Sequence, residues 1–264
     1  MNTYDKIYFE DFRKKFAYEK AMNLIMKVNE VIGVCDTKEK AYLLKSTTRV
    51  ATEIALAIGS ILSDERRDFH YKVAIRQAYE LSKLIREEVE VKCFGECIQI
   101  LEEIIKLLRT YRKNLRLKEN TKVKKVEVGD KLDLTKIEEM IGSLKDFRAL
   151  KAYEKMMDFY TRLFAILEKL PFYEQYSIFS QTQRASESII ANLSEGNARG
   201  VLGYKLVEAN FYSIAFGSAI EVQAWLDIMK IKKYISQEEH RILDSMIEEI
   251  KKLVIVYIKR IVNI

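Results

Sequence analysis

The residues best placed to do chemistry form a basic run from Lys106 to Lys131, which holds ten lysine or arginine side chains and three acidic ones. The net charge of the whole chain is only +6, so this segment has a larger positive excess than the entire protein. Arg109, Arg112 and Arg116 are spaced three and four residues apart, which places them on one face of a helix. Clustered cations attract polyanions, and phosphate contacts from such a stripe give salt-sensitive binding without sequence preference. The candidate nucleic-acid contacts are Arg109, Arg112, Lys113, Arg116, Lys118, Lys122, Lys124 and Lys125, with Arg199 from the second half.

Two plainer interpretations of the same run stay open. Cations near the C-terminus of a helix interact favourably with its dipole, so the run is also consistent with a solvated helix end. The run could equally meet an acidic protein surface and no nucleic acid. The function classes that remain are therefore a nucleic-acid binder and a protein-interaction module.

Residues that could catalyse a reaction are scarce. The chain has two histidines, His70 and His240, one in each half. It contains no glycine-rich phosphate loop, no Glu-x-x-His pair of the di-iron bundles, and no nucleophile next to a base in sequence. Paired carboxylates such as Glu102-Glu103 fit exposed helix charge. We expect no enzymatic activity, no catalytic residue, no bound metal and no cofactor, and we give a hidden nuclease low weight.

The three cysteines do not form an even-numbered disulfide framework, which fits a reducing compartment. Cys35 is expected in the first interhelical loop, and Cys93 and Cys97 around the third, so all three would lie at one end of a bundle. Zinc normally takes a fourth ligand. Buried or incidental thiols are the better prediction.

Localisation follows from hydropathy. No apolar run approaches the ~20 residues that span a bilayer, and the N-terminus lacks the basic and apolar pattern of a signal peptide. We expect a soluble, cytoplasmic protein that makes no membrane contact.

A repeated stretch gives the architecture that must position the basic run. The copies read Asp11-Phe12-Arg13 then Tyr18-Glu19-Lys20, and Asp146-Phe147-Arg148 then Tyr153-Glu154-Lys155, 135 residues later. Arg49 and Arg184 are separated by the same shift. A fixed repeat of this length indicates two similar units in tandem.

Composition and periodicity predict that both units are helical. One proline and nine glycines in 264 residues are too few for the turns of a β or α/β fold. Apolar residues recur at helical spacing in four segments of each half, with turns predicted at Gly95 and at Gly196–Gly203. The predicted fold is all-α, with two tandem antiparallel up-down four-helix bundles joined by a basic linker. The predicted domains are residues 1–116, a linker at 117–136, and residues 137–264.

The segment after Gln183 carries a longer pattern. It reads Gln183-Arg184-Ala185-Ser186-Glu187-Ser188-Ile189-Ile190-Ala191-Asn192-Leu193-Ser194-Glu195-Gly196 and then Arg199, with Phe211, Ala215, Gly217, Ser218 and Glu221 downstream. This resembles the signature R-x-A-x-S-I-P-A-N-I-A-E-G and F-x-x-x-A-x-G-S-x-x-E of the four-helix-bundle family encoded in 23S ribosomal RNA intervening sequences. The resemblance covers about residues 143–263. The family-motif positions are Arg184, Ser188, Asn192, Glu195, Gly196, Gly217, Ser218 and Glu221.

The resemblance implies a function. The same superfamily includes accessory variability proteins of diversity-generating retroelements, which form basic oligomers that bind a reverse transcriptase and its RNA. We therefore expect a non-enzymatic scaffold that binds a reverse transcriptase or another nucleic-acid enzyme, together with RNA. The alternative is a structural protein-interaction module without nucleic acid. The sequence leaves open RNA against DNA, and whether the two units imitate a homodimer or assemble into a larger homo-oligomer.

Single polar or aromatic residues on packing faces favour structural roles. Asn192 is expected to fix helix register, as one buried amide does in coiled helices, and Glu195 to pair locally. Trp225 fits a core or an interface equally well. Tyr4, Tyr8, Phe9 and Phe12 precede the first helix and are expected to dock on a neighbouring surface.

Overall fold

The computed structural model describes residues 11–34, 37–88, 91–115 and 146–262, and every regular element in these ranges is a helix. The eight α-helices there are α1 (Phe16–Val31), α2 (Thr37–Gly59), α3 (Asp64–Glu88), α4 (Val91–Lys113), α6 (Lys151–Leu167), α7 (Ser180–Val201), α8 (Lys205–Ile231) and α9 (Gln237–Val262). Short 3-10 turns are η1 (Phe12–Lys14), η2 (Ile32–Val34), η3 (Phe147–Ala149) and η4 (Phe172–Glu174), and η5 (Gln175–Phe179) is a π-helical turn. The all-α prediction is confirmed.

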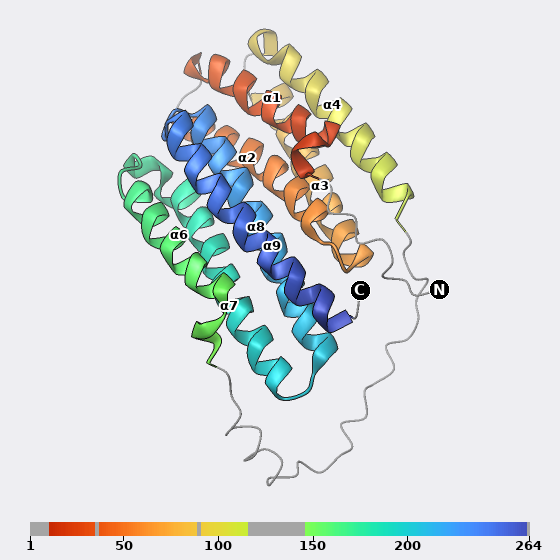
Figure 1. Cartoon of the computed structure of the whole chain (residues 1–264). Coiled ribbons are helices and arrows are strands. Elements are labelled where there is room, and N and C mark those ends of the chain that lie inside the picture. Colours follow the sequence, from red (N-terminus) through yellow and green to blue (C-terminus); the bar gives the residue numbers. More distant parts are fainter. Residues whose placement is uncertain (1–10, 35–36, 89–90, 116–145, 263–264) are drawn as a thin grey trace.

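Each half is a closed bundle of four helices. Helices α1 to α4 each pack on the next, and α1 also packs on α4. Helices α6 to α9 repeat this arrangement, with α6 packed on α9. Figure 1 shows the first bundle in red to yellow beside the second in green to blue. The two-bundle prediction is confirmed, while the proposed boundaries at 116 and 137 lie outside the described residues.

The repeated stretch adopts the same local structure twice. The carboxylate of Asp11 accepts a hydrogen bond from the backbone N–H of Arg13 at 3.1 Å, and Asp146 accepts one from Arg148 at 3.0 Å. Each aspartate starts a 3-10 turn, after which α1 or α6 begins. The sequence echo therefore marks equivalent entry turns of the two bundles.

Helix starts follow the capping residues of the sequence. Ser63 accepts a hydrogen bond from the backbone N–H of Arg66 at 3.1 Å. Before α9, Ser236 and Glu239 form a reciprocal capping box, with N–H to side-chain distances of 3.1 and 2.8 Å. These bonds satisfy donors that have no partner within the helix, which fixes where the helix starts.

Two predicted turns are wrong. Helix α4 begins at Val91, so Gly95 lies inside it. Helix α7 continues to Val201, and the chain turns only around Gly203, where φ is +82°. A Cβ on Gly196 would lie 2.6 Å from the ring of Tyr212, so this glycine permits the close approach of α8 rather than a turn.

The two bundles also pack directly against each other, through α2 and α8. A Cβ on Gly59 of α2 would lie 3.1 Å from the Cα of Gly217 in α8, so the two backbones nearly touch. The buried apolar residues of both bundles belong to one cluster. The bundles therefore form one body and do not depend on the linker to hold them together.

Some predictions fall outside the described residues: the linker 117–136 and the roles of Tyr4, Tyr8 and Phe9. Phe12 is described and is buried, with 1% of its surface exposed. Within the described part of the chain, no helix is long and apolar enough to cross a membrane.

Candidate functional site

The C-terminal end of α4 carries the described part of the basic run. Lys106, Arg109 and Lys113 are exposed there. Arg112 instead turns toward α3, where its Nε donates to the carboxylate of Asp68 at 2.6 Å. It is an anchor between two helices, and it has less freedom to contact a phosphate than its neighbours have.

The contacts of Asp68 stabilise the link between α3 and α4. Its side chain is 6% exposed and is also bonded by Lys72 at 2.6 Å. Burial alone raises the pKa of a carboxyl group, but the hydrogen bonds from Arg112 and Lys72 outweigh it and lower the pKa of Asp68. The carboxylate stays charged and holds α4 against α3.

An aromatic side chain accompanies the exposed cations. The guanidinium of Arg109 donates to the hydroxyl of Tyr79 on α3 and lies 5.5 Å from the centre of its ring. Tyr79 is 46% exposed. An exposed ring beside cations is a surface on which nucleic-acid bases stack while phosphates meet the charges. Sequence reasoning missed Tyr79, because only the packing of α3 on α4 brings it to Arg109.

The remaining basic candidates are not gathered at this point. Arg116, Lys118, Lys122, Lys124 and Lys125 lie outside the described residues. Arg199 lies near the C-terminus of α7 in the second bundle, 3.7 Å from Glu195. Glu195 therefore pairs locally, and Arg199 is not part of the α4 surface.

The family-motif residues pack α7 against α8. The hydroxyls of Ser188 and Ser218 are 2.8 Å apart across the two helices. Asn192 donates to the backbone oxygen of Ser188 at 2.7 Å and so stays within its own helix. Gly196 makes room for Tyr212, and Gly217 faces α2 of the first bundle. The motif positions therefore serve helix packing, including the contact between the bundles.

Glu221 and Arg184 take different positions. Glu221 lies on α8, the helix that packs on α2, and burial raises the pKa of its carboxyl group to about 7, with a further increase from Glu53 of α2. Glu53 is itself bonded to Nδ1 of His70 at 2.8 Å. Arg184 is exposed on α7. A protonatable carboxyl group thus lies half-buried where the two bundles meet.

The entry turn of the first bundle is held by the second. Arg13 donates to Asp227 of α8 at 2.8 and 2.9 Å and to Asp244 of α9 at 2.7 and 3.0 Å. Asp227 also accepts from the hydroxyl of Tyr18 at 3.0 Å and contacts Nε2 of His240 at 2.7 Å. Burial lowers the pKa of Arg13, but the two carboxylates outweigh it and raise it.

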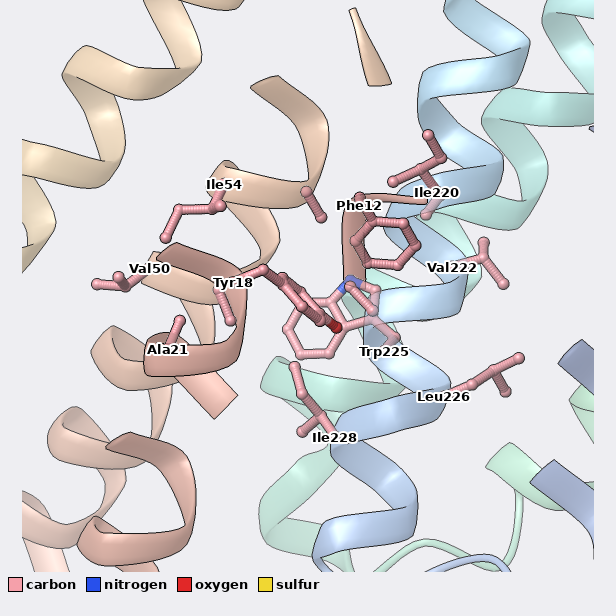
Figure 2. Packing of buried hydrophobic residues seen from close by; sticks show 14 of the residues in the cluster. Phe12, Tyr18, Ala21, Val50, Ile54, Ile220, Val222, Trp225, Leu226 and Ile228 are labelled. Carbon is pink, nitrogen blue, oxygen red and sulfur yellow. The ribbon is translucent and has the colours of Figure 1, made fainter. Parts of the chain in front are cut away.

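The aromatic residues of this contact are buried between the bundles. Figure 2 shows the side chains of Phe12, Tyr18 and Trp225 directed into the space between α1 and α8. The rings of Phe12 and Tyr18 pack edge to face, with centroids 4.7 Å apart. Trp225 is 3% exposed and belongs to the shared core.

The repeat in the sequence identified Arg13, but its partners Asp227 and Asp244 lie more than 200 residues away and gave no local signal.

No group of three or more histidine, cysteine or acidic residues in the described part of the chain lies close enough to hold a metal ion. Cys97 is buried, and burial raises the pKa of its thiol to about 11. Cys35 and the side chain of Cys93 lie outside the described residues, so their predicted convergence stays a prediction.

Comparison with known proteins adds one finding. The model of a family described as 23S rRNA-intervening sequence protein matches residues 148–256, which span α6, α7, α8 and most of α9. No curated protein and no solved structure matches the chain. The match stops short of the first bundle. The C-terminal half of this protein therefore contains a domain of the 23S rRNA-intervening sequence protein family.

Proposed function

We propose that this protein is a non-enzymatic scaffold that binds RNA at the end of α4 and holds a protein partner such as a reverse transcriptase. The observation that carries the RNA part is the cluster of exposed Lys106, Arg109 and Lys113 beside the exposed ring of Tyr79. Cations contact phosphates and a ring stacks on bases, so this surface suits a single strand. The chain continues from α4 into the rest of the basic run, which adds further positive charge in the sequence next to this helix.

The first bundle is, in this proposal, a diverged copy of the second. The equivalent entry turns and the same helix order support a tandem duplication. The family-motif segment at Asn192 has no counterpart in the first bundle, where the equivalent stretch is Leu56-Ala57-Ile58-Gly59-Ser60. Divergence has left the first bundle with the basic surface and the second with the motif.

The proposed absence of enzymatic activity is based on the contacts of the two histidines. His70 is bonded to Glu53 and His240 to Asp227, both in ion-pair networks that hold helices together. Within the described ranges, the side-chain hydrogen bonds of both histidines are to carboxylates, and neither is to a nucleophile that it could activate as a base. The proposed role is therefore to bring macromolecules together.

The test is RNA binding by the full chain at two salt concentrations, with a single-stranded RNA as the probe. Arg109→Ala with Lys113→Ala should weaken binding by roughly tenfold and reduce the salt slope by about 1.4, since each of the two phosphate contacts contributes about 0.7 to the slope for a single strand. Arg112 is not substituted, because its removal would leave the buried carboxylate of Asp68 without this cation. The control, Arg162→Ala with Lys252→Ala, removes two exposed cations from the second bundle.

A second variant separates stacking from charge. Tyr79→Leu should weaken binding by roughly tenfold with the salt slope unchanged, because base stacking on a ring is worth about 1–3 kcal/mol. Equal affinity of wild type, the α4 variant, Tyr79→Leu on α3 and the control would reject RNA binding at this surface. That outcome would favour the protein-interaction module. Arg76, Lys83 and Arg86 on α3 support this alternative, because each is already paired with a nearby glutamate.

A further inference from the structure

Three aromatic side chains project from the turn between α6 and α7. Phe172, Tyr173 and Tyr176 are 82%, 68% and 81% exposed. Single exposed apolar residues are ordinary, but three large rings within five residues form a patch, and such patches mark interaction sites. Aromatic residues are also enriched among the residues that dominate binding energy in protein interfaces.

The turn that carries these rings is rigid. Between them, Glu174 points inward with 2% of its surface exposed. Its carboxylate accepts hydrogen bonds from Lys232 at 2.8 Å, from the hydroxyl of Tyr234 at 2.9 Å, and from Ser177. Burial would raise the pKa of Glu174, but the charge of Lys232 outweighs it and lowers the pKa, so the carboxylate remains charged and holds its donors.

The backbone of the turn and the ring of Tyr173 are held by these contacts. The hydroxyls of Tyr173 and Tyr234 are 3.1 Å apart, and the turn follows Pro171, whose ring fixes the backbone. A backbone that is already ordered loses little conformational entropy on binding, which favours affinity. The buried Glu174–Lys232 pair therefore anchors the turn from which Phe172 and Tyr176 project.

The first bundle shows that the fold does not need these rings. At positions 135 residues earlier, Phe172, Tyr173 and Tyr176 correspond to Thr37, Lys38 and Ala41. Helix α2 begins at Thr37 and includes these three positions, whereas the second bundle has a 3-10 and a π-helical turn there. A bundle of the same plan is thus built without aromatic residues at these three positions, and the patch is a property of the second bundle alone.

The surroundings of the patch indicate what binds there. The exposed charges on the adjoining ends of α6, α8 and α9 are close to balanced, with Glu168, Glu238 and Glu239 against Lys169, Lys230, Lys233 and Arg241. RNA and anionic lipid surfaces both require a positive excess. A balanced polar rim around an aromatic centre is the composition of a protein interface.

The size of the patch shows how much further surface a partner must cover. With about 200 Å² for each ring, the exposed fractions amount to about 460 Å². A stable interface buries about 800 Å² on each side. The three rings are therefore the centre of a larger contact, which the partner extends over the polar rim.

We propose that Phe172, Tyr173 and Tyr176 are the docking centre for a separate folded protein that offers an apolar pocket to the rings. This site is in the second bundle, and the RNA surface is on α3 and α4 of the first. The proposal concerns the protein partner of the function above and holds whether or not RNA binds at α4.

The first step of the test is photo-crosslinking with the full chain. A photoreactive phenylalanine analogue replaces Phe172, or Phe16 as a control that is 67% exposed on α1. After irradiation in extract of the native cells, the Phe172 adduct should be one discrete species that protease destroys and ribonuclease does not. An RNA adduct, a lipid adduct, a dimer of this chain, or the same products from both positions would overturn the proposal.

The second step measures affinity for the crosslinked protein after its separate purification. Phe172→Ser with Tyr176→Ser should weaken binding at least 30-fold, while Phe16→Ser with Tyr204→Ser should leave it within twofold. The RNA affinity of the first variant should be unchanged, and Arg109→Ala with Lys113→Ala should keep its partner affinity. Equal partner affinity of the aromatic variant and wild type would overturn the proposal, while loss of RNA binding alone would bear only on the proposed function.

Discussion

The carboxylate of Asp227 gathers donors from both bundles. Arg13 and Tyr18 reach it from the first bundle, and His240 reaches it from α9 of its own bundle. The equivalent of Arg13 in the repeat is Arg148, which is 69% exposed and, among the described residues, contacts its neighbours Asp146, 3.4 Å away, and Phe147. One copy of the repeated arginine thus joins the bundles, and the other remains at the surface.

Arg13→Ala should lower the free energy of unfolding by about 2–3 kcal/mol, because it leaves Asp227 and Asp244 partly buried without their cation. Arg148→Ala is the matched control and should change it by less than about 0.5 kcal/mol, as is usual for an exposed pair. Chemical denaturation of both variants checks this. Equal losses would show that Arg13 does not hold the bundles together.

Glu221 should make stability fall as the pH rises. Its pKa is raised from 4.5 to about 7 in the folded state, so the native protein binds an extra proton between those values. The favourable contribution is complete below pH 4.5 and is lost as the pH passes 7, to a total of about 3 kcal/mol. Glu221→Gln should match wild type near pH 4 and exceed its stability at pH 8. An unchanged difference across that range, from denaturation at each pH, would contradict the shift.

The glycines in the helices differ in how much space they leave for a larger side chain. In α7, Gly196 lies against the ring of Tyr212, while Gly95 in α4 has no other side chain within 4 Å of the position of a Cβ. At the interface, Gly59 and Gly217 let α2 and α8 approach each other. Glycine is costly in a helix, so the positions that need it are those where a second helix is close.

Gly95→Ala should raise the free energy of unfolding by about 0.5–1 kcal/mol, since alanine favours the helix and meets open space. Gly196→Ala should lower it by about 1–3 kcal/mol, because the added methyl group overpacks against Tyr212. Thermal melts of the two variants provide the comparison. If Gly95→Ala destabilised the protein, Gly95 would be in a turn and not in α4.

The two bundles form one body because α2 and α8 are each buried on both sides. Sixteen residues of α8 are buried, from Ala209 to Met229, which is more than one bundle face requires. An α-helix that is apolar on nearly all sides belongs in the interior of a larger protein. The boundary between the bundles is thus a continuation of the core.

Unfolding should therefore be one cooperative transition of the whole chain. In calorimetry, the measured enthalpy should equal the van't Hoff enthalpy for a single peak. Two separate peaks would show that the bundles unfold independently. As a check, Gly59→Leu should split the peak, because the larger side chain forces α2 away from α8 at Gly217.

Local features of the fold could be predicted from the sequence, and long-range contacts could not. The repeat at Asp11 and Asp146 and the helical periodicity depend on residues close in sequence, so these patterns sufficed. Gly196 was mispredicted because glycine marks both turns and close helix contacts, and Gly95 because glycine also occurs inside a helix where no neighbour requires it.

In the candidate site as well, local features could be predicted from the sequence and long-range contacts could not. The exposed cations Arg109 and Lys113 were found from charge and spacing, while Arg112 proved to be an anchor because Asp68, 44 residues earlier, lies opposite it. Tyr79 and the aromatic patch around Phe172 required knowledge of exposure, which periodicity does not give for residues at the edge of a packing face.

The central claim is that the protein joins RNA to a protein partner and performs no reaction. Its most direct test is purification of the native complex after crosslinking, followed by sequencing of the RNA and identification of the proteins. The account predicts one recurrent protein and RNA that is retained by wild type and lost with Arg109→Ala and Lys113→Ala. Recovery of the chain alone, or of RNA that is unaffected by those changes, would contradict it.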